Sequence, residues 1–90
     1  MEQNDLQRAL MAVLFAAGKP VAASRLAESL QVDESEIHRE CEALMSALSF
    51  NRSGIRIVRL ENAYQMCSSA EMAEYVTKTL ETRKPPKLSP

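Results

Sequence analysis

Apolar residues recur at helical spacing in the first half of the chain, and short breaks divide them into three segments. In the first segment, which we expect to begin after Asn4 or Asp5, the apolar positions are Leu6, Leu10, Val13, Leu14 and Ala17. Gly18 suits the left-handed position that ends a helix, and Pro20 prevents the helix from continuing. A second, shorter helix is expected to open at Ser24 or the residue before it. Its inward positions are Leu26, Ala27 and Leu30.

The third segment, residues 33–50, follows a tight connection formed by Gln31 and Val32. Asp33 and Glu36 have the spacing of a capping box, in which the Asp side chain accepts from a first-turn amide and the Glu side chain reaches back. The apolar stripe of this segment consists of Ile37, Cys41, Leu44, Met45 and Leu48. A packing helix followed by two helices with a short turn between them predicts a helix-turn-helix core.

Two strand-forming runs follow, Ile55–Leu60 and Tyr64–Ser68, on either side of residues 61–63. If Asn62-Ala63 is a two-residue turn, Ala63 must adopt an unfavourable positive φ. A three-residue loop avoids this and changes which side chains face each other, so the sequence leaves both registers open. Ser68 or Ser69 is expected to cap a last helix. The apolar stripe of that helix is Met72, Tyr75, Val76, Thr79 and Leu80.

These elements predict a mainly α domain with a small β-hairpin: a winged helix-turn-helix with three helices, a two-stranded wing and a C-terminal helix. With two Phe, two Tyr and no Trp, the core must consist of aliphatic residues and Met, which favours helices. We expect the winged-helix domain to span residues 1–82. Residues 83–90, with three prolines, are expected to form an extended tail or linker toward a missing second domain.

The charge of the third segment is unusual for a helix at this place in such a fold. Helix-turn-helix proteins place a helix in the major groove of DNA and neutralise phosphates with Lys and Arg. Here the charged residues besides His38 are Asp33, Glu34, Glu36, Glu40 and Glu42 against Arg39. The first acids favour the positive end of the helix dipole by roughly 0.3–1 kcal/mol each, but this is the end nearest DNA in a recognition helix. Together with a net charge of −1, the pattern argues against sequence-specific DNA binding.

Two surfaces are candidates for contact with a partner or a second copy. The outward face of the third segment is Ser35, Arg39, Glu42, Ala43 and Ser46. Such small and nearly neutral residues suit close packing of another chain, and a simply solvated face fits the sequence equally well. Tyr64 and Met66 form the second candidate, because the open edge of a hairpin can pair with another chain. Residues of this kind usually cover the helical core instead.

Arg52, Arg56 and Arg59 give the predicted wing some positive charge and are the candidates for nonspecific DNA contact. Strand alternation places Arg56 and Arg59 on opposite faces, so the two cannot form one patch on a flat strand. Arginines that balance the nearby acids are the preferred interpretation.

The sequence predicts no catalytic, metal or cofactor site. Cys41 and Cys67 are far apart, and with His38 as the single histidine they cannot complete a four-ligand zinc site from Cys and His. We expect two buried, reduced thiols. With two glycines in the chain there is no glycine-rich phosphate loop. The apolar run 11–17 is too short to cross a membrane and no basic n-region precedes it, so we expect a cytoplasmic protein without a membrane partner.

Several segments, taken in order, resemble the segregation and condensation protein B (ScpB) family. They are residues 14–21 with Leu26-Ala27, residues 54–58 with Tyr64-Gln65-Met66, and the Tyr75-Val76 helix with Arg83, Pro86 and residues 87–89. The resemblance covers nearly the full chain. Two departures stand out: Asn62-Ala63 replace a pair of glycines usual at the wing tip, and the chain ends at Pro90, where the family's second winged helix would begin.

The resemblance implies a non-enzymatic subunit of the bacterial SMC–ScpA–ScpB condensin-like complex, acting in chromosome condensation and partition. It implies a homodimer that binds the kleisin ScpA and, through ScpA, the SMC ATPase at the nucleoid, with direct DNA binding weak or absent. In the family the N-terminal winged helix looks like the dimerising half, and much of the ScpA contact is attributed to the second half. The alternative functions are a DNA-binding winged-helix transcriptional regulator and a domain that spaces a larger protein.

Overall fold

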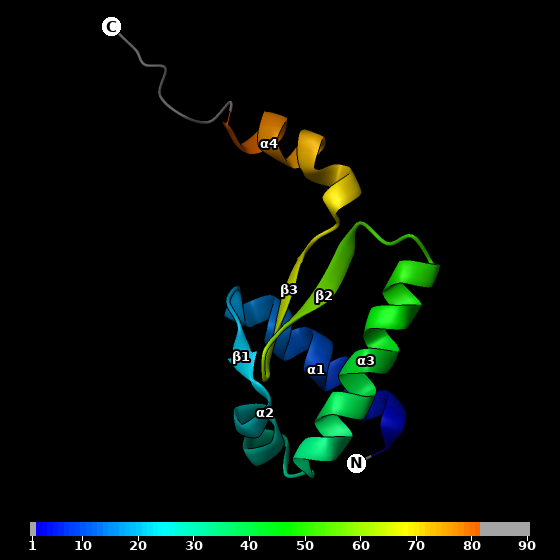
Figure 1. The fold of residues 1–90 in the computed structure, drawn as a ribbon, viewed down its shortest axis with the longest axis vertical. Helices are drawn as coiled ribbons and strands as arrows, with labels where there is room; N and C mark the ends of the chain where they lie inside the picture. The colour runs from blue at the N-terminus through cyan, green and yellow to red at the C-terminus, as the bar shows by residue number, and fades with distance from the viewer. Residues whose placement is uncertain (1, 82–90) are drawn as a thin grey trace, which may run out of the picture.

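The computed structural model describes residues 2–81. Its elements, shown in Figure 1, are α1 (Gln3–Ala17), β1 (Val21–Ala22), α2 (Ala23–Leu30), α3 (Glu34–Phe50), β2 (Ile55–Leu60), β3 (Ala63–Ser68), the 3₁₀ turn η1 (Ala70–Met72) and α4 (Ala73–Glu81). The predicted winged helix-turn-helix is confirmed, with one addition: β1 pairs antiparallel with β3, so the sheet has three strands in the order β1-β3-β2. The predicted tail, residues 83–90, lies outside the described residues.

The helix ends lie close to the positions that the sequence predicts, but the predicted capping box does not form. Gly18 adopts a φ of 65° and its amide donates to the Leu14 carbonyl, which ends α1 as predicted. Asp33 occupies the N-cap position of α3, but its side chain makes no capping hydrogen bond. The Asp33 backbone carbonyl instead accepts the Glu36 amide at 3.0 Å, and the Glu36 carboxylate lies 4.0 Å from Arg39. The predicted capping box is therefore wrong, because Glu36 turns along the helix and not back toward its start.

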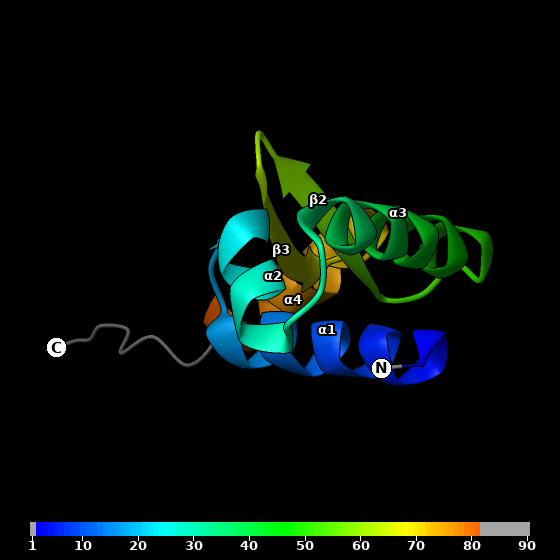
Figure 2. The same ribbon diagram turned by 90° about the horizontal axis from the view of Figure 1, so that it is seen from below.

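The core lies between the first three helices and one face of the sheet. Figure 2 shows α1 and α3 one above the other, with α2 at one end of both and the sheet beside them. The buried apolar residues are Leu6, Leu10, Leu14, Ala23, Leu26, Ile37, Cys41, Leu44, Ile57 and Tyr64. The stripes predicted for the first three helices thus supply most of the core.

The wing turns at Glu61-Asn62, which differs from both expected registers. Leu60 pairs with Ala63, and the positive φ of 58° falls on Glu61 instead of Ala63. Ala63 is an extended strand residue because it also pairs with Ala22 of β1. The turn is held by the Arg59 Nε, which donates to the Glu61 carbonyl at 2.9 Å.

The last helix carries the predicted apolar stripe but does not join the core. Met72 is 37%, Tyr75 is 63% and Leu80 is 51% exposed. In Figure 1, η1 and α4 continue past the end of the sheet and project away from α1 and α2. The described part of the chain therefore ends in an amphipathic helix whose apolar face has little cover.

Candidate partner-binding surfaces

The predicted outward face of α3 is exposed in the structure. Ser35, Arg39, Glu42, Ala43 and Ser46 all lie at the surface. Its charged members are already engaged: Arg39 lies 3.7 Å from Glu40, and the Glu42 carboxylate lies 3.4 Å from Arg59 of the wing. The remaining residues are small, so this face offers shape for close packing more than charge. Its role in partner binding stays a prediction.

Tyr64 is fully buried, which corrects its assignment to a partner or dimer surface. β3 is the central strand of the sheet, and β1 pairs with its first two residues, so Tyr64 packs under the helices. Its hydroxyl lies 2.7 Å from the Nδ1 of His38. Met66 is half-buried and packs against the core, so only part of its side chain is accessible.

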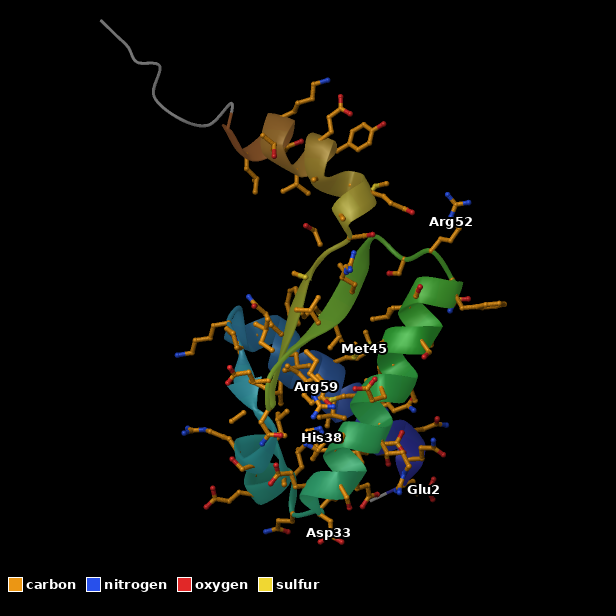
Figure 3. The ribbon with its side chains drawn as sticks, in the orientation of Figure 1. Glu2, Asp33, His38, Met45, Arg52 and Arg59 are labelled. Carbon is orange, nitrogen blue, oxygen red and sulfur yellow. The ribbon has the colours of Figure 1, made fainter. Side chains whose placement is uncertain are left out.

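A polar network that the sequence did not predict joins α3 to the wing around Tyr64. Figure 3 shows His38 and Arg59 between α3 and the β2–β3 hairpin. The His38 Nε2 lies 3.7 Å from Glu34, and the Asn62 side-chain amide donates to the same Glu34 oxygen at 2.8 Å. The guanidinium of Arg59 lies 5.7 Å from the centre of the Tyr64 ring. Burial raises the pKa of the Tyr64 hydroxyl above its usual value, while the Arg59 cation acts in the opposite direction.

Tyr64→Phe is expected to lower the free energy of unfolding by about 1 kcal/mol, because it removes the hydrogen bond to His38 and keeps the ring. Urea denaturation followed by circular dichroism measures the change. Tyr75→Phe is the matched control, since Tyr75 is exposed and should change stability by less than about 0.5 kcal/mol. Equal effects of the two substitutions would contradict the His38–Tyr64 contact.

A buried carboxylate, Glu40, connects the start of α1 to α3. It is 4% exposed and accepts hydrogen bonds from Gln7 at 2.8 Å and from Gln3 at 3.3 Å. The charge pattern of the sequence shows Glu40 only as one of the acids of the third helix. Two features of the sequence could have indicated a buried carboxylate here. Glu40 stands next to Cys41 of the apolar stripe, and Gln3 and Gln7 are four positions apart on α1.

The three arginines of the wing separate into two groups. Arg59 is engaged by Glu42 and by the Glu61 carbonyl, which supports the interpretation that it balances a nearby acid. Arg52 and Arg56 are exposed, and within residues 2–81 neither side chain makes a hydrogen bond or an ion pair. DNA contact by any of the three stays a prediction.

Arg52 and Arg56 flank a groove between the end of α3 and β2, with a volume of about 310 Å³. The apolar part of its wall is Met45, Leu48, Ile55 and Ile57. Figure 3 shows Met45 on the side of α3 that faces β2, and Arg52 just beyond the end of the helix. Ser69 and Glu71, where the chain leaves β3, close one end of the groove. The groove is therefore lined by four apolar residues, with two arginines and one glutamate as its charged residues.

Residues 2–81 contain neither a candidate metal centre nor a candidate membrane-spanning helix. No cluster of His, Cys, Asp and Glu in this range has an arrangement that could hold a metal ion. No helix in the same range combines the length and apolar character needed to cross a membrane. Both cysteines are free thiols, but only Cys41 is fully buried, whereas Cys67 is half-buried. The expectation of two buried thiols is thus confirmed for Cys41 alone.

The fold and these surfaces define a winged helix-turn-helix domain whose third helix begins with acids where a DNA-reading helix would be basic. Within this class, the chain belongs to the ScpB family: the family model described as segregation and condensation complex subunit ScpB matches residues 8–90. The resemblance inferred from the sequence is confirmed.

Curated relatives and solved structures agree with this assignment. Segregation and condensation protein B of Clostridioides difficile is 32% identical, over 99% of this chain and 51% of its own length. The protein of that name from Caldanaerobacter subterraneus subsp. tengcongensis is 38% identical over 77% of this chain and 41% of its own length. The chain therefore spans about half the length of the curated relatives it matches.

Two solved structures are especially similar. The crystal structure of ScpB from Mycobacterium tuberculosis has a TM-score of 0.89 and 26% identity, covering 98% of this chain and 55% of that one. The crystal structure of a dimer of the ScpB N-terminal domain complexed with an ScpA peptide has a TM-score of 0.78 and 28% identity. It covers 84% of this chain and 95% of the compared chain, so the described fold corresponds to nearly the whole of that domain.

Proposed function

We propose that this chain is a non-enzymatic subunit of a bacterial SMC–ScpA–ScpB complex, which self-associates and binds the kleisin ScpA. The observation that carries the proposal is its similarity to the dimeric ScpB N-terminal domain complexed with an ScpA peptide. Through ScpA, the chain would act with the SMC ATPase in chromosome condensation and partition, at the nucleoid in the cytoplasm.

The distribution of charge supports protein contact over DNA readout. The first turn of α3 carries Glu34 and Glu36 after the acidic N-cap Asp33, so a phosphate backbone approaching this end would meet three carboxylates. Arg59 is neutralised by Glu42. The exposed small residues of α3 and the exposed apolar face of α4 are instead suited to contact with protein.

Isothermal titration of the 90-residue chain with ScpA from the same genome tests the proposal. We expect binding with a Kd of about 10 µM or tighter. The same chain should not bind duplex DNA measurably at about 150 mM salt, where exposed charges are screened beyond roughly 8 Å. Failure to bind ScpA would contradict the proposal. DNA binding with a steep salt dependence that disappears when Arg52, Arg56 and Arg59 are substituted would favour the regulator instead.

A matched pair of variants tests whether the outer face of α3 contacts ScpA. Ser46→Arg places a bulky side chain among the small residues of that face, and Ala16→Arg makes a comparable change on the exposed side of α1. If α3 packs against ScpA, the Ser46 variant should bind at least about tenfold more weakly and the Ala16 variant should bind normally. Equal affinity of both variants would assign this face to solvent.

A further inference from the structure

A groove lies where the end of α1, the strand β1 and the start of α2 meet, and we call it the β1 groove. Its volume is about 460 Å³, within the range of about 300–1,000 Å³ that is usual for ligand pockets. The apolar residues of its wall are Val13, Ala17, Pro20, Val21 and Ala22. Figure 1 shows β1 at the edge of the sheet away from α3, so this groove is separate from the one between α3 and β2.

The two charged residues of the β1 groove are both cations. Lys19 lies in the connection after α1, and Arg25 lies in the first turn of α2. Both are exposed, and within residues 2–81 neither side chain makes a hydrogen bond or an ion pair. No acid lines the groove to balance them. An anion that also covers the apolar wall would pair with these cations away from bulk water, where salt screens the attraction less.

The start of α2 adds hydrogen-bond donors to the same place. Its N-cap residue is Ala22, which has no side-chain acceptor, and its first turn contains no acid. The Ala23 amide donates to the Asn62 carbonyl at 2.8 Å, whereas the next amides have no acceptor within the helix. A carboxylate in the β1 groove would therefore meet backbone amides and the positive end of the helix dipole as well as the two cations.

The composition of the β1 groove favours a peptide over a nucleic acid. A nucleic-acid backbone is held by several cations that neutralise successive phosphates, but this groove has two cations beside five apolar residues. Because β1 is an edge strand of the sheet, an extended chain can also lie along it. Apolar side chains interleaved with carboxylates would match the wall and the charge together.

We propose that the β1 groove binds an extended, acidic peptide segment of a partner protein. The apolar side chains of that segment pack against the groove wall, and one of its carboxylates lies between Lys19 and Arg25 at the start of α2. This inference goes beyond the proposed function and depends neither on self-association nor on ScpA binding.

Titration of the isotope-labelled 90-residue chain with the peptide acetyl-Gly-Leu-Asp-Leu-Glu-Leu-Gly-amide, followed by NMR, tests the inference. The amide signals of residues 19–25 should shift, with a Kd of about 1 mM or tighter. A neutral peptide with Asn and Gln in place of the two acids should bind at least about tenfold more weakly, because it keeps the apolar contacts and loses the ion pairs.

A matched pair of variants tests the role of the two cations. Lys19→Glu/Arg25→Glu should weaken binding of the acidic peptide at least about tenfold. Arg52→Glu/Arg56→Glu makes the same charge change at two exposed, unpaired arginines of the other groove and should bind within about threefold of the unmodified chain. Far-UV circular dichroism confirms that both variants are folded.

Ala22→Asp separates binding from stability. The new carboxylate supplies the missing cap of α2, so the urea midpoint should rise. It also occupies the place between Lys19 and Arg25, so the acidic peptide should bind at least about fivefold more weakly. Weaker binding by a more stable chain excludes unfolding as the cause, whereas unchanged binding would contradict a carboxylate at this position.

Several results would overturn the inference. Equal affinity for the acidic and the neutral peptide would do so, as would equal affinity of Lys19→Glu/Arg25→Glu and the unmodified chain. Signal shifts confined to residues 45–57 would place the peptide in the groove between α3 and β2. Duplex DNA that binds at residues 19–25 more tightly than the peptide would assign the β1 groove to nucleic acid. ScpA binding is judged by its own titration, so each of these results leaves the proposed function standing.

Discussion

Replacing Leu10 with alanine is expected to lower the free energy of unfolding by about 2–5 kcal/mol, because the substitution leaves a cavity in a close-packed core. Leu10 is fully buried at the middle of α1, between Leu6 and Leu14, where α1 packs against α3 and β3. Small domains have a total stability of about 5–15 kcal/mol, so this loss removes a large share of it. Urea denaturation measures the change, with an unchanged m-value showing that the same surface is exposed on unfolding.

Phe15→Ala is the control for this prediction, since it truncates a large apolar side chain on the same helix. Phe15 is exposed, so the substitution should change stability by no more than about 0.5 kcal/mol. The ratio of the two effects reports which side of α1 faces the core. A cost at Phe15 equal to that at Leu10 would show that α1 is rotated about its axis relative to the structure.

The helices were predictable because their signals are local. Gly18 and Pro20 end the first helix through backbone geometry that depends on those residues alone, and the Leu spacing of α1 determines its buried side. β1 was not predictable in the same way. Val21 and Ala22 are too few to show strand periodicity, and their extended conformation depends on pairing with Tyr64 and Ala63 far along the chain.

The polar contacts were not predicted because they, too, join residues that are far apart along the chain. The His38–Tyr64 contact joins residues 26 positions apart, and the Gln7–Glu40 hydrogen bond joins residues 33 positions apart. Propensity and periodicity do not reveal which distant side chains meet. A residue such as Tyr64 therefore looks equally suited to a core or a surface until β1 is known to lie beside it.

The candidate surfaces were likewise predictable where they depend on a single element, and not where they depend on packing between elements. Strand alternation correctly placed Arg56 and Arg59 apart, because it is a property of the strand itself. That Arg59 meets Glu42 while Arg56 shares a groove with Arg52 depends on how β2 packs against α3. The apolar stripe of α4 follows from the periodicity of the sequence. Its exposure depends on the direction in which the helix leaves the sheet, which the periodicity does not determine.

Alkaline pH is expected to destabilise the domain through Cys41. Burial raises the pKa of the Cys41 thiol from 9.0 to about 12, and the carboxylates of Glu42 and Glu40 act in the same direction. In the unfolded chain the thiol ionises from about pH 9, while in the folded chain it stays protonated until about pH 12. The folded state therefore holds more protons in this window, so stability is full below pH 9 and is lost as the pH rises toward 12. For one proton the slope is about 1.4 kcal/mol per pH unit, which amounts to about 2–3 kcal/mol by pH 11.

Urea denaturation of the unmodified chain, Cys41→Ala and Cys67→Ala, from about pH 8 to about pH 11, isolates this contribution. Cys41→Ala should lower stability at neutral pH but flatten its dependence on alkaline pH, because the buried thiol is no longer present to ionise. Tyr64 keeps part of the slope in every variant, since its pKa is also raised by burial. Cys67→Ala, at the half-buried cysteine of β3, should keep the slope of the unmodified chain. Parallel pH profiles for Cys41→Ala and the unmodified chain would mean that the Cys41 thiol ionises as readily in the folded state as in the unfolded one, which is incompatible with its place at the centre of α3.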